Sequence, residues 1–126
     1  MLESSQAVAF LPSEDLERSE RFFHEVLGLP VVSRSDFACV IACAGSSLRI
    51  TKVDGLRPQP FTVLGWLVED LTSVIGRLRA AGTSMAHFDG LDQDDLGVWT
   101  TPTGDRVAWF HDPDRNLLSV TQLATG

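Results

Sequence analysis

Two amphipathic segments, separated by a nearly constant interval, constrain this sequence more than any other feature. The first begins at Asp15 and ends at Gly28, and the second begins at Asp70 and ends at Gly82, so their starts lie 55 residues apart and their ends 54. In both segments the Asp can cap the first helical turn, and the Gly can adopt the left-handed conformation that follows a helix. Because extended-looking segments flank each helix, the pattern predicts a duplicated strand–helix–three-strand unit.

The apolar residues of the two segments recur at the spacing of an amphipathic α-helix. Charged residues such as Glu17, Arg18 and Arg21 fill the remaining positions of the first segment and are expected to face water. The predicted buried stripes are Leu16, Phe23, Val26 and Leu27 in the first helix and Leu71, Val74, Ile75 and Leu78 in the second. Each helix therefore has one face that should pack on a sheet.

Short apolar segments bounded by turn-forming residues predict the strands. They are 7–11, 31–33, 37–43 and 47–53 in the first half and 61–69, 84–88, 97–101, 106–111 and 117–123 in the second, with a hairpin expected across 102–105. The stretch 54–60 contains one Gly and two Pro and is predicted to be a linker. The chain is thus predicted to be a single α+β domain, residues 1–126, with module one at about 7–53 and module two at about 61–123.

Composition excludes several classes of function. The net charge of −7 argues against a nucleic-acid partner, because few cations are available to neutralise phosphates. The longest apolar run, 37–44, is far shorter than the ~18 residues of a membrane-spanning helix, and the N-terminus lacks a basic secretion signal. No membrane partner is therefore expected, and the cytoplasm is the expected location. Cys39 and Cys43 share one predicted strand, about 13 Å apart at ~3.3 Å per residue, so two buried free thiols are predicted.

Several local strings, in this order and spacing, resemble the vicinal oxygen chelate superfamily of glyoxalases, bleomycin-resistance proteins and extradiol dioxygenases. The strings are DLERS at 15–19 with FF at 22–23 and VLGL at 26–29, VEDL at 68–71 with AG at 81–82, and FHDPDRNL at 110–117. The resemblance covers nearly the whole chain. It implies two βαβββ modules forming a curled mixed sheet, an open barrel around a cavity with the helices outside, and a homodimer. Arg115 stands where the family commonly has Gly, so a mildly strained left-handed turn is expected there.

The resemblance also implies where a metal would bind. Family enzymes place His or Glu ligands on the first and last strand of each module, and by motif spacing these positions fall near Val8, Arg49, Leu64 and Ser119. None of these side chains is a good ligand for Zn²⁺, Fe²⁺ or Mn²⁺. We therefore expect a member with no metal and no cofactor. A site built from His87, His111 and an Asp remains conceivable, although no fixed spacing supports it.

Period-two alternation along the strands predicts which residues line the cavity. The candidate ligand-binding residues are Phe10, Arg49, Thr51, Leu64, Trp66, Trp99 and Ser119, with Val63 and Leu67 expected on the opposite face from Leu64 and Trp66. Arg49 has two interpretations: a partner in an internal salt bridge or a cation reaching solvent, or an anchor for an acidic or carbonyl-bearing ligand. The tryptophans are core residues or stacking surfaces for a planar ligand, with Trp66 preferred for stacking and Trp99 second. Trp109 is undecided between the core and an interface.

These residues favour a binding protein. The predicted lining is apolar and aromatic with few polar groups, which is typical of a small-molecule pocket. No nucleophilic triad or phosphate-binding loop is visible, so no catalytic residue is assigned. We expect a metal-independent protein that binds a planar or acidic organic molecule; the alternative is a lyase, isomerase or dioxygenase-like enzyme of the same superfamily. The acidic stretch 89–96 is either a solvated loop or a mobile lid.

Overall fold

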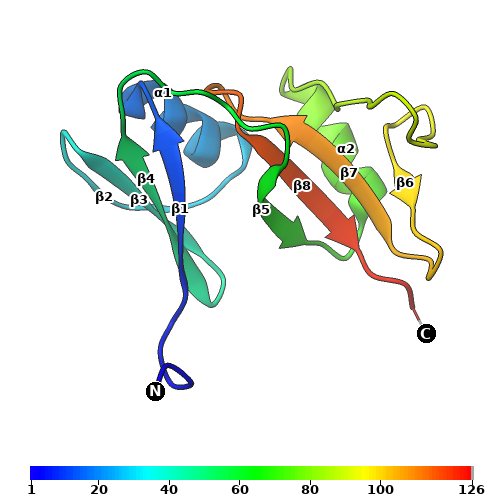
Figure 1. The fold of residues 1–126 in the computed structure, drawn as a ribbon, viewed down its shortest axis with the longest axis horizontal. Coiled ribbons are helices and arrows are strands. Elements are labelled where there is room, and N and C mark those ends of the chain that lie inside the picture. The colour runs from blue at the N-terminus through cyan, green and yellow to red at the C-terminus, as the bar shows by residue number, and fades with distance from the viewer. Residues whose placement is uncertain (126) are drawn as a thin grey trace. The chain divides into compact units, whose positions relative to one another are not determined.

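The computed structural model describes residues 1–125, which divide into two compact units, one ending at Pro58 and the other beginning at Gln59. Each unit contains a four-stranded mixed sheet and one helical segment (Figure 1). The chain is therefore an α+β protein with two βαβββ-like modules, as the repeated helices predict. We describe each module by itself.

In module one the sheet has the strand order β1-β4-β3-β2. The first and last strands of the module are parallel neighbours, with Phe10 opposite Arg49, and the other pairs are antiparallel. Its elements are β1 (Val8–Ser13), α1 (Leu16–Arg21), a π-helical turn η1 (Phe22–Val26), β2 (Val31–Arg34), β3 (Ala38–Cys43) and β4 (Ser46–Lys52).

Module two repeats this topology with the order β5-β8-β7-β6. Its first and last strands are again parallel, with Gly65 opposite Ser119, and β7 pairs antiparallel with both neighbours. Its elements are β5 (Thr62–Leu67), α2 (Leu71–Ala80), β6 (Trp99–Thr100), β7 (Arg106–His111) and β8 (Leu117–Gln122). The hairpin predicted across 102–105 is confirmed, because β6 and β7 pair across it.

Both predicted helix caps are confirmed. The Asp15 carboxylate accepts a hydrogen bond from the Arg18 N–H at 3.1 Å, and the Asp70 carboxylate accepts one from the Ser73 N–H at 3.1 Å. The stop signals are confirmed as well, since Gly28 has a φ of 74° and Gly82 a φ of 90°.

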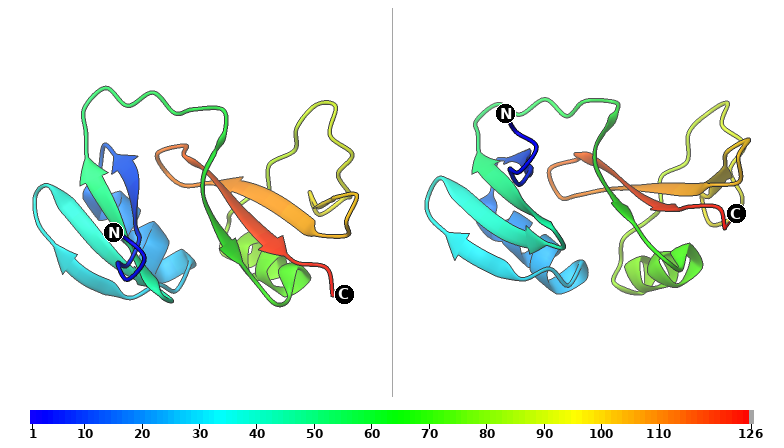
Figure 2. Two further views of the ribbon diagram at one scale, coloured as in Figure 1. Left: turned by 60° about the horizontal axis from the view of Figure 1, so that its bottom comes forward. Right: turned by 90° about the horizontal axis from the view of Figure 1, so that it is seen from below.

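Each helix packs on one face of its own sheet (Figure 2). In module one the buried Ser13 and Ser19 hydroxyls, 2.7 Å apart, tie β1 to α1. In module two the Gln122 amide oxygen accepts a hydrogen bond from the Leu71 N–H at 2.8 Å and so ties β8 to the start of α2. The cores lie between helix and sheet and include Leu11, Phe23, Ile41, Leu48 and Ile50 in module one and Leu71, Ile75, Ala108, Phe110, Leu118 and Val120 in module two.

Two predicted strands need correction. The segment 84–88 makes only one isolated bridge, between Met85 and Phe110, and is not a strand. It fails to extend because a side chain, Gln93, takes the Phe88 N–H and the Ala86 carbonyl that a neighbouring strand would use. β6 is shorter than the predicted strand 97–101, because the Asp94 carboxylate accepts hydrogen bonds from the Leu96 and Val98 N–H groups and so holds the preceding residues in a turn. Both cysteines are free, Cys39 buried and Cys43 half-buried, so the absence of a disulfide agrees with the predicted strand geometry.

The turn between β7 and β8 is left-handed at Arg115, with a φ of 68°, as the missing Gly predicts. The buried Asp112 carboxylate organises this turn by accepting hydrogen bonds from the Asp114 N–H at 3.0 Å and the Asn116 N–H at 2.8 Å. Burial raises the pKa of Asp112 to about 6; the Asn116 hydrogen bonds oppose that rise and the nearby Asp114 charge adds to it.

Candidate functional site

Each sheet has a second face that carries no helix of its own module, which we call the open face. The register places Gly65, Ser119 and Trp109 side by side across the open face of module two, and Trp99 beside Val107 along the same face. In module one the corresponding row is Phe10, Arg49 and Val40. The open faces therefore carry most of the residues that alternation selected.

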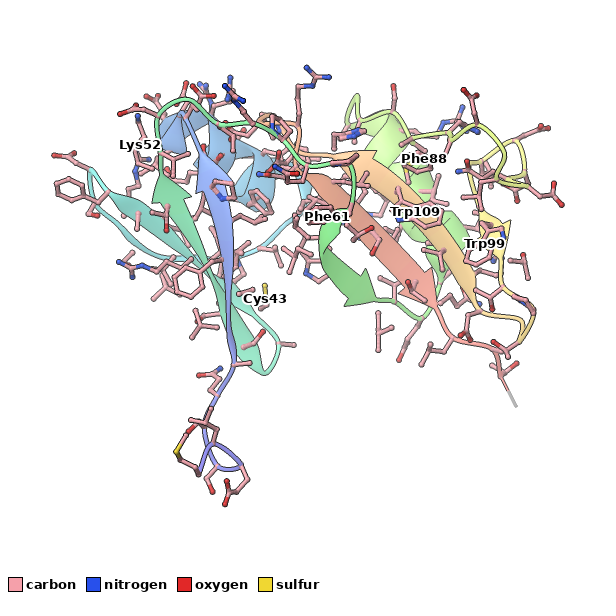
Figure 3. All side chains as sticks on the ribbon, in the orientation of Figure 1. Cys43, Lys52, Phe61, Phe88, Trp99 and Trp109 are labelled. Atoms are coloured by element: carbon pink, nitrogen blue, oxygen red, sulfur yellow. The ribbon has the colours of Figure 1, made fainter. Side chains whose placement is uncertain are left out.

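Three aromatic residues gather on module two, and we call Phe88, Trp99 and Trp109 the aromatic platform (Figure 3). The Trp99 and Trp109 rings stack, with centroids 6.4 Å apart and planes at 28°. The Phe88 ring stands at 89° to Trp109, with centroids 5.5 Å apart. Both indoles are half-buried and Phe88 is 36% exposed, so the platform is open to a flat molecule.

The orientation of Trp109 is fixed by a hydrogen bond. Its indole Nε1–H donates to the Thr62 hydroxyl on β5 at 3.1 Å, across the intervening strand β8. The ring is thus held by its polar edge. Of the two roles considered for Trp109, the core is excluded, because the ring is half-buried on the open face; a role in an interface stays a prediction.

Gly65, opposite Ser119 on the same open face as Trp109, leaves space above the sheet because it has no side chain. A Cβ added at Gly65 would lie 2.4 Å from the Ser119 Oγ, so only a residue without a side chain leaves the Ser119 hydroxyl in this position. Within residues 1–125 that hydroxyl has no hydrogen-bond partner and is half-buried. Ser119 is therefore free to bind a polar group of a ligand lying against Trp109.

The predicted orientation of Leu64 and Trp66 is wrong. The register pairs Leu64 with Leu118 and Trp66 with Val120, which face the helix, and the Trp66 ring stacks on the buried Phe110 at 6.5 Å. Leu67, predicted to lie behind the sheet, is instead 71% exposed. The cause is a register irregularity between Thr62 and Leu64 in the pairing of β5 with β8, which alternation counted without an interruption cannot detect.

On module one the three candidate residues Phe10, Arg49 and Thr51 all lie on the open face. Phe10 is 63% exposed, Arg49 is exposed and Thr51 is half-buried. The Arg49 guanidinium makes no ion pair or hydrogen bond with any residue in 1–125, so the predicted internal salt bridge is absent from the described part of the chain. It is a free cation in the middle of a largely apolar face.

Two observations on the described residues concern metal binding and membranes. Residues 1–125 contain no group of three His, Cys, Asp or Glu side chains placed to hold a metal ion. None of their helices is long and apolar enough to cross a membrane. Module two also has a polar surface pocket of about 210 Å³, lined by Arg79, Ser84, Met85, His87, Asp95 and Leu96.

Sequence reasoning missed three residues of the site: Phe88, Thr62 and Gly65. Phe88 lies in the segment mistaken for a strand, and Thr62 reaches Trp109 from two strands away, so no local pattern marks either one. An isolated Gly inside a strand did offer a signal, because such a residue often marks a close approach.

The family comparison agrees with this architecture. The model of the glyoxalase/bleomycin resistance protein/dioxygenase superfamily matches residues 5–120. The chain belongs to this superfamily. No curated protein sequence matches the chain.

Solved structures show the same fold. An antibiotic-binding protein, TnmS3 from Streptomyces sp. CB03234, is 24% identical, with a TM-score of 0.75 and coverage of 98% of this chain and 99% of that one. A glyoxalase-related enzyme from Fulvimarina pelagi is 25% identical, with a TM-score of 0.71 and coverage of 93% and 86%. The fosfomycin resistance protein FosX from Listeria monocytogenes is 16% identical, with a TM-score of 0.74 and coverage of 94% and 92%.

Proposed function

We propose that this protein binds a planar or acidic organic molecule without a metal ion. The observation that carries the proposal is the aromatic platform, three aromatic side chains on a sheet face that carries no helix. Flat ligands stack on such surfaces, and the free Ser119 hydroxyl beside Trp109 can bind a ligand oxygen. The neighbour TnmS3 is described as an antibiotic binding protein, which is consistent with this kind of role.

Module one supports the acidic part of the proposal. Arg49 presents a guanidinium that the described residues leave unpaired, and Phe10 and Thr51 lie on the same face. A guanidinium binds a carboxylate or phosphate through two parallel hydrogen bonds. The proposed ligand-binding residues are therefore Trp99, Trp109 and Ser119 on the open face of module two and, as a second surface, Phe10, Arg49 and Thr51 on the open face of module one. The chemistry at the open-face positions to which the resemblance assigns metal ligands supports metal independence, since Val8 and Ser119 are poor ligands.

Binding of a flat molecule is tested by calorimetric titration with 2-naphthoate, a planar carboxylate. Trp109→Ala and Trp99→Ala should each weaken affinity about tenfold, because each removes a stacking surface worth about 1 kcal/mol beyond area burial. Trp66→Ala is the matched control: it truncates an indole on the covered face and should lower stability with affinity unchanged. Equal affinities for all four proteins would refute the platform as the binding surface.

The role of Arg49 is tested by comparing 2-naphthoate with its neutral amide. Arg49→Met should weaken binding of the carboxylate and leave the amide unaffected, because only the carboxylate can form the charged pair. Arg79→Met is the control, since Arg79 lines the separate polar pocket. If Arg79→Met weakens binding of the carboxylate and Arg49→Met does not, the anion site lies in that pocket.

The alternative function is a lyase, isomerase or dioxygenase-like enzyme. The observation that keeps it in view is the likeness to a glyoxalase-related enzyme at 25% identity. Metal analysis of the purified protein, with and without chelator treatment, separates the two: a stoichiometric ion whose removal abolishes ligand binding would favour the enzyme.

The homodimer implied by the family resemblance remains part of the proposal. The single curled sheet implied by the same resemblance is not found in residues 1–125, whose strands form two four-stranded sheets. Exposed apolar residues support association, among them Phe10, Phe37 at 77% exposure and Phe61 at 57%. Outer strands such as β2 and β5 also leave one edge unpaired within their sheets. Light scattering after size exclusion should give twice the mass of 13.8 kDa; a monomer at micromolar concentration would contradict it.

A further inference from the structure

We propose that Gln93 is the positioning residue of the aromatic platform: its amide holds Phe88, Trp99 and Trp109 in their relative orientation without touching the ligand. The ligand-binding part of this inference rests on the proposed function. The geometric part does not, because it concerns the side chains of the platform alone.

The Gln93 side chain makes three hydrogen bonds, and all are to backbone. Its Oε1 accepts from the Phe88 N–H at 2.7 Å, and its Nε2 donates to the Ala86 carbonyl at 3.0 Å and the Gly97 carbonyl at 2.8 Å. One half-buried amide thus bridges the two ends of the loop that joins Phe88 to Trp99. The loop is fastened by this side chain.

Each platform residue is connected to Gln93 by a short path. Phe88 is bound directly through its own N–H, and the amide also donates to the carbonyl of Gly97, two residues before Trp99. Trp109 is reached through one intervening residue, because the Ala86 N–H donates to the Trp109 carbonyl at 2.8 Å while the Ala86 carbonyl accepts from Gln93. The amide therefore lies where the three backbone segments of the platform meet.

The chemistry of these bonds requires a primary amide of this length. One acceptor and two donors must come from one planar group, which Gln supplies and Glu does not, since an ionised carboxylate only accepts. Tight packing surrounds the bridge: a Cβ at Gly97 would lie 3.3 Å from the Met85 Cβ, and Gly97 has a φ of 85°. A side chain at this position would strain the backbone and press on Met85, so Gly favours the closed loop.

A neighbouring residue provides the contrast. Asp94 Oδ1 accepts hydrogen bonds from the Leu96 and Val98 N–H groups, both at 2.9 Å, and so organises the loop locally. None of these bonds reaches Phe88 or the segment beside Trp109. Loss of the Asp94 carboxylate should loosen the loop and leave Phe88 against Trp109, whereas loss of the Gln93 amide should release both Phe88 and Trp99.

The test measures the platform with no ligand present. Near-ultraviolet circular dichroism reports the coupling of the Trp99 and Trp109 rings, and Trp66, on the covered face, contributes equally in every variant. Gln93→Met keeps the length and removes the amide; it should lose at least half of the near-ultraviolet signal while the far-ultraviolet spectrum is unchanged. Gln6→Met, at an exposed position near the N-terminus, is the matched control and should change neither.

The ligand arm uses 2-naphthoate and the same proteins. Gln93→Met should weaken its affinity about tenfold, comparable to the direct loss of one stacking residue. If the wild-type protein does not bind 2-naphthoate, the proposed function fails for this probe while the dichroism still decides the inference. Retention of both signal and affinity in Gln93→Met would overturn it. Should Gln93→Met fail to fold, Gln93→Asn, whose shorter amide cannot span the three groups, is judged by the same two measurements.

Discussion

The two modules share one topology and differ in the chemistry of their open faces. Across strands one, four and three of module one runs the row Phe10, Arg49 and Val40; the corresponding row of module two is Gly65, Ser119 and Trp109. The aromatic side chain lies on the edge strand β1 in module one and on the inner strand β7 in module two. The helix caps and the apolar periodicity thus specify the fold of each module. The side chains of its open face can differ without changing that fold.

The connections between the last two strands also differ. Module one turns through Ala44 and Gly45, with a φ of 75° at the glycine and no carboxylate. Module two turns through Asp112–Asn116, with a buried carboxylate and an arginine in the left-handed position. The turn of module two therefore contains a titratable buried group that the turn of module one lacks.

The largest effect expected is pH dependence from Asp112. Its pKa is about 6 in the folded protein against an ordinary value of 3.8, so the folded state binds more protons between these values. Stability should therefore fall as pH rises from about 4 to about 6, by about 3 kcal/mol at 1.4 kcal/mol per pH unit. Urea denaturation across this pH range measures the change in the free energy of unfolding, and Asp112→Asn should abolish most of it. If the variant shows the same pH dependence as the wild type, another group is responsible.

Next in size is Gly65→Ala, which gives the open face of module two a side chain on its edge strand. The new Cβ would meet the Ser119 Oγ at 2.4 Å, and we expect a loss of about 1–2 kcal/mol in the free energy of unfolding. Ser119→Ala removes the clashing oxygen, so the double variant should recover most of that loss. A double-mutant cycle by chemical denaturation gives the coupling energy, and additive effects would contradict the close approach.

Arg115→Gly should stabilise the protein by about 1 kcal/mol. The residue has a φ of 68°, a conformation that costs a non-glycine residue about this much. Thermal unfolding should show a rise of a few degrees. The same substitution at Arg57, in the linker, is the control and should give no gain; a lower melting temperature for Arg115→Gly would mean that the side chain makes a contact worth more than the strain.

The smallest effect is expected for Arg49→Met. Since Arg49 forms no ion pair within residues 1–125, its loss should change stability by less than about 0.5 kcal/mol, the range of ordinary surface substitutions. A loss above 2 kcal/mol in the free energy of unfolding, measured by chemical denaturation, would show that the guanidinium has a structural partner. Arg49 would then not be available to bind an anion.

The sequence predicted the modules well because their signals are local. The capping Asp15 and Asp70, the helix-ending glycines and the turn at Arg115 each depend on a few neighbouring residues, and all are as expected. Phe10, Arg49 and Thr51 could be placed on the open face of module one, and Ser119 on that of module two, because their strands alternate regularly.

What could not be predicted depends on long-range geometry. The faces of Leu64 and Trp66 were reversed because an irregularity in the β5–β8 register shifts the alternation by one residue. The role of Gln93 was invisible for another reason: its three partners are backbone groups at 86, 88 and 97, which carry no sequence signature. Side chains that replace strand pairing are found only when the chain path is known.

The hydrogen bond from Trp109 to Thr62 has a consequence for selectivity. Because the indole N–H of Trp109 already donates to Thr62, the side chain can contact a ligand only through the faces and apolar edges of its ring. Under the proposed function, discrimination between the polar substituents of a stacked ring must therefore come from neighbouring groups such as the Ser119 hydroxyl.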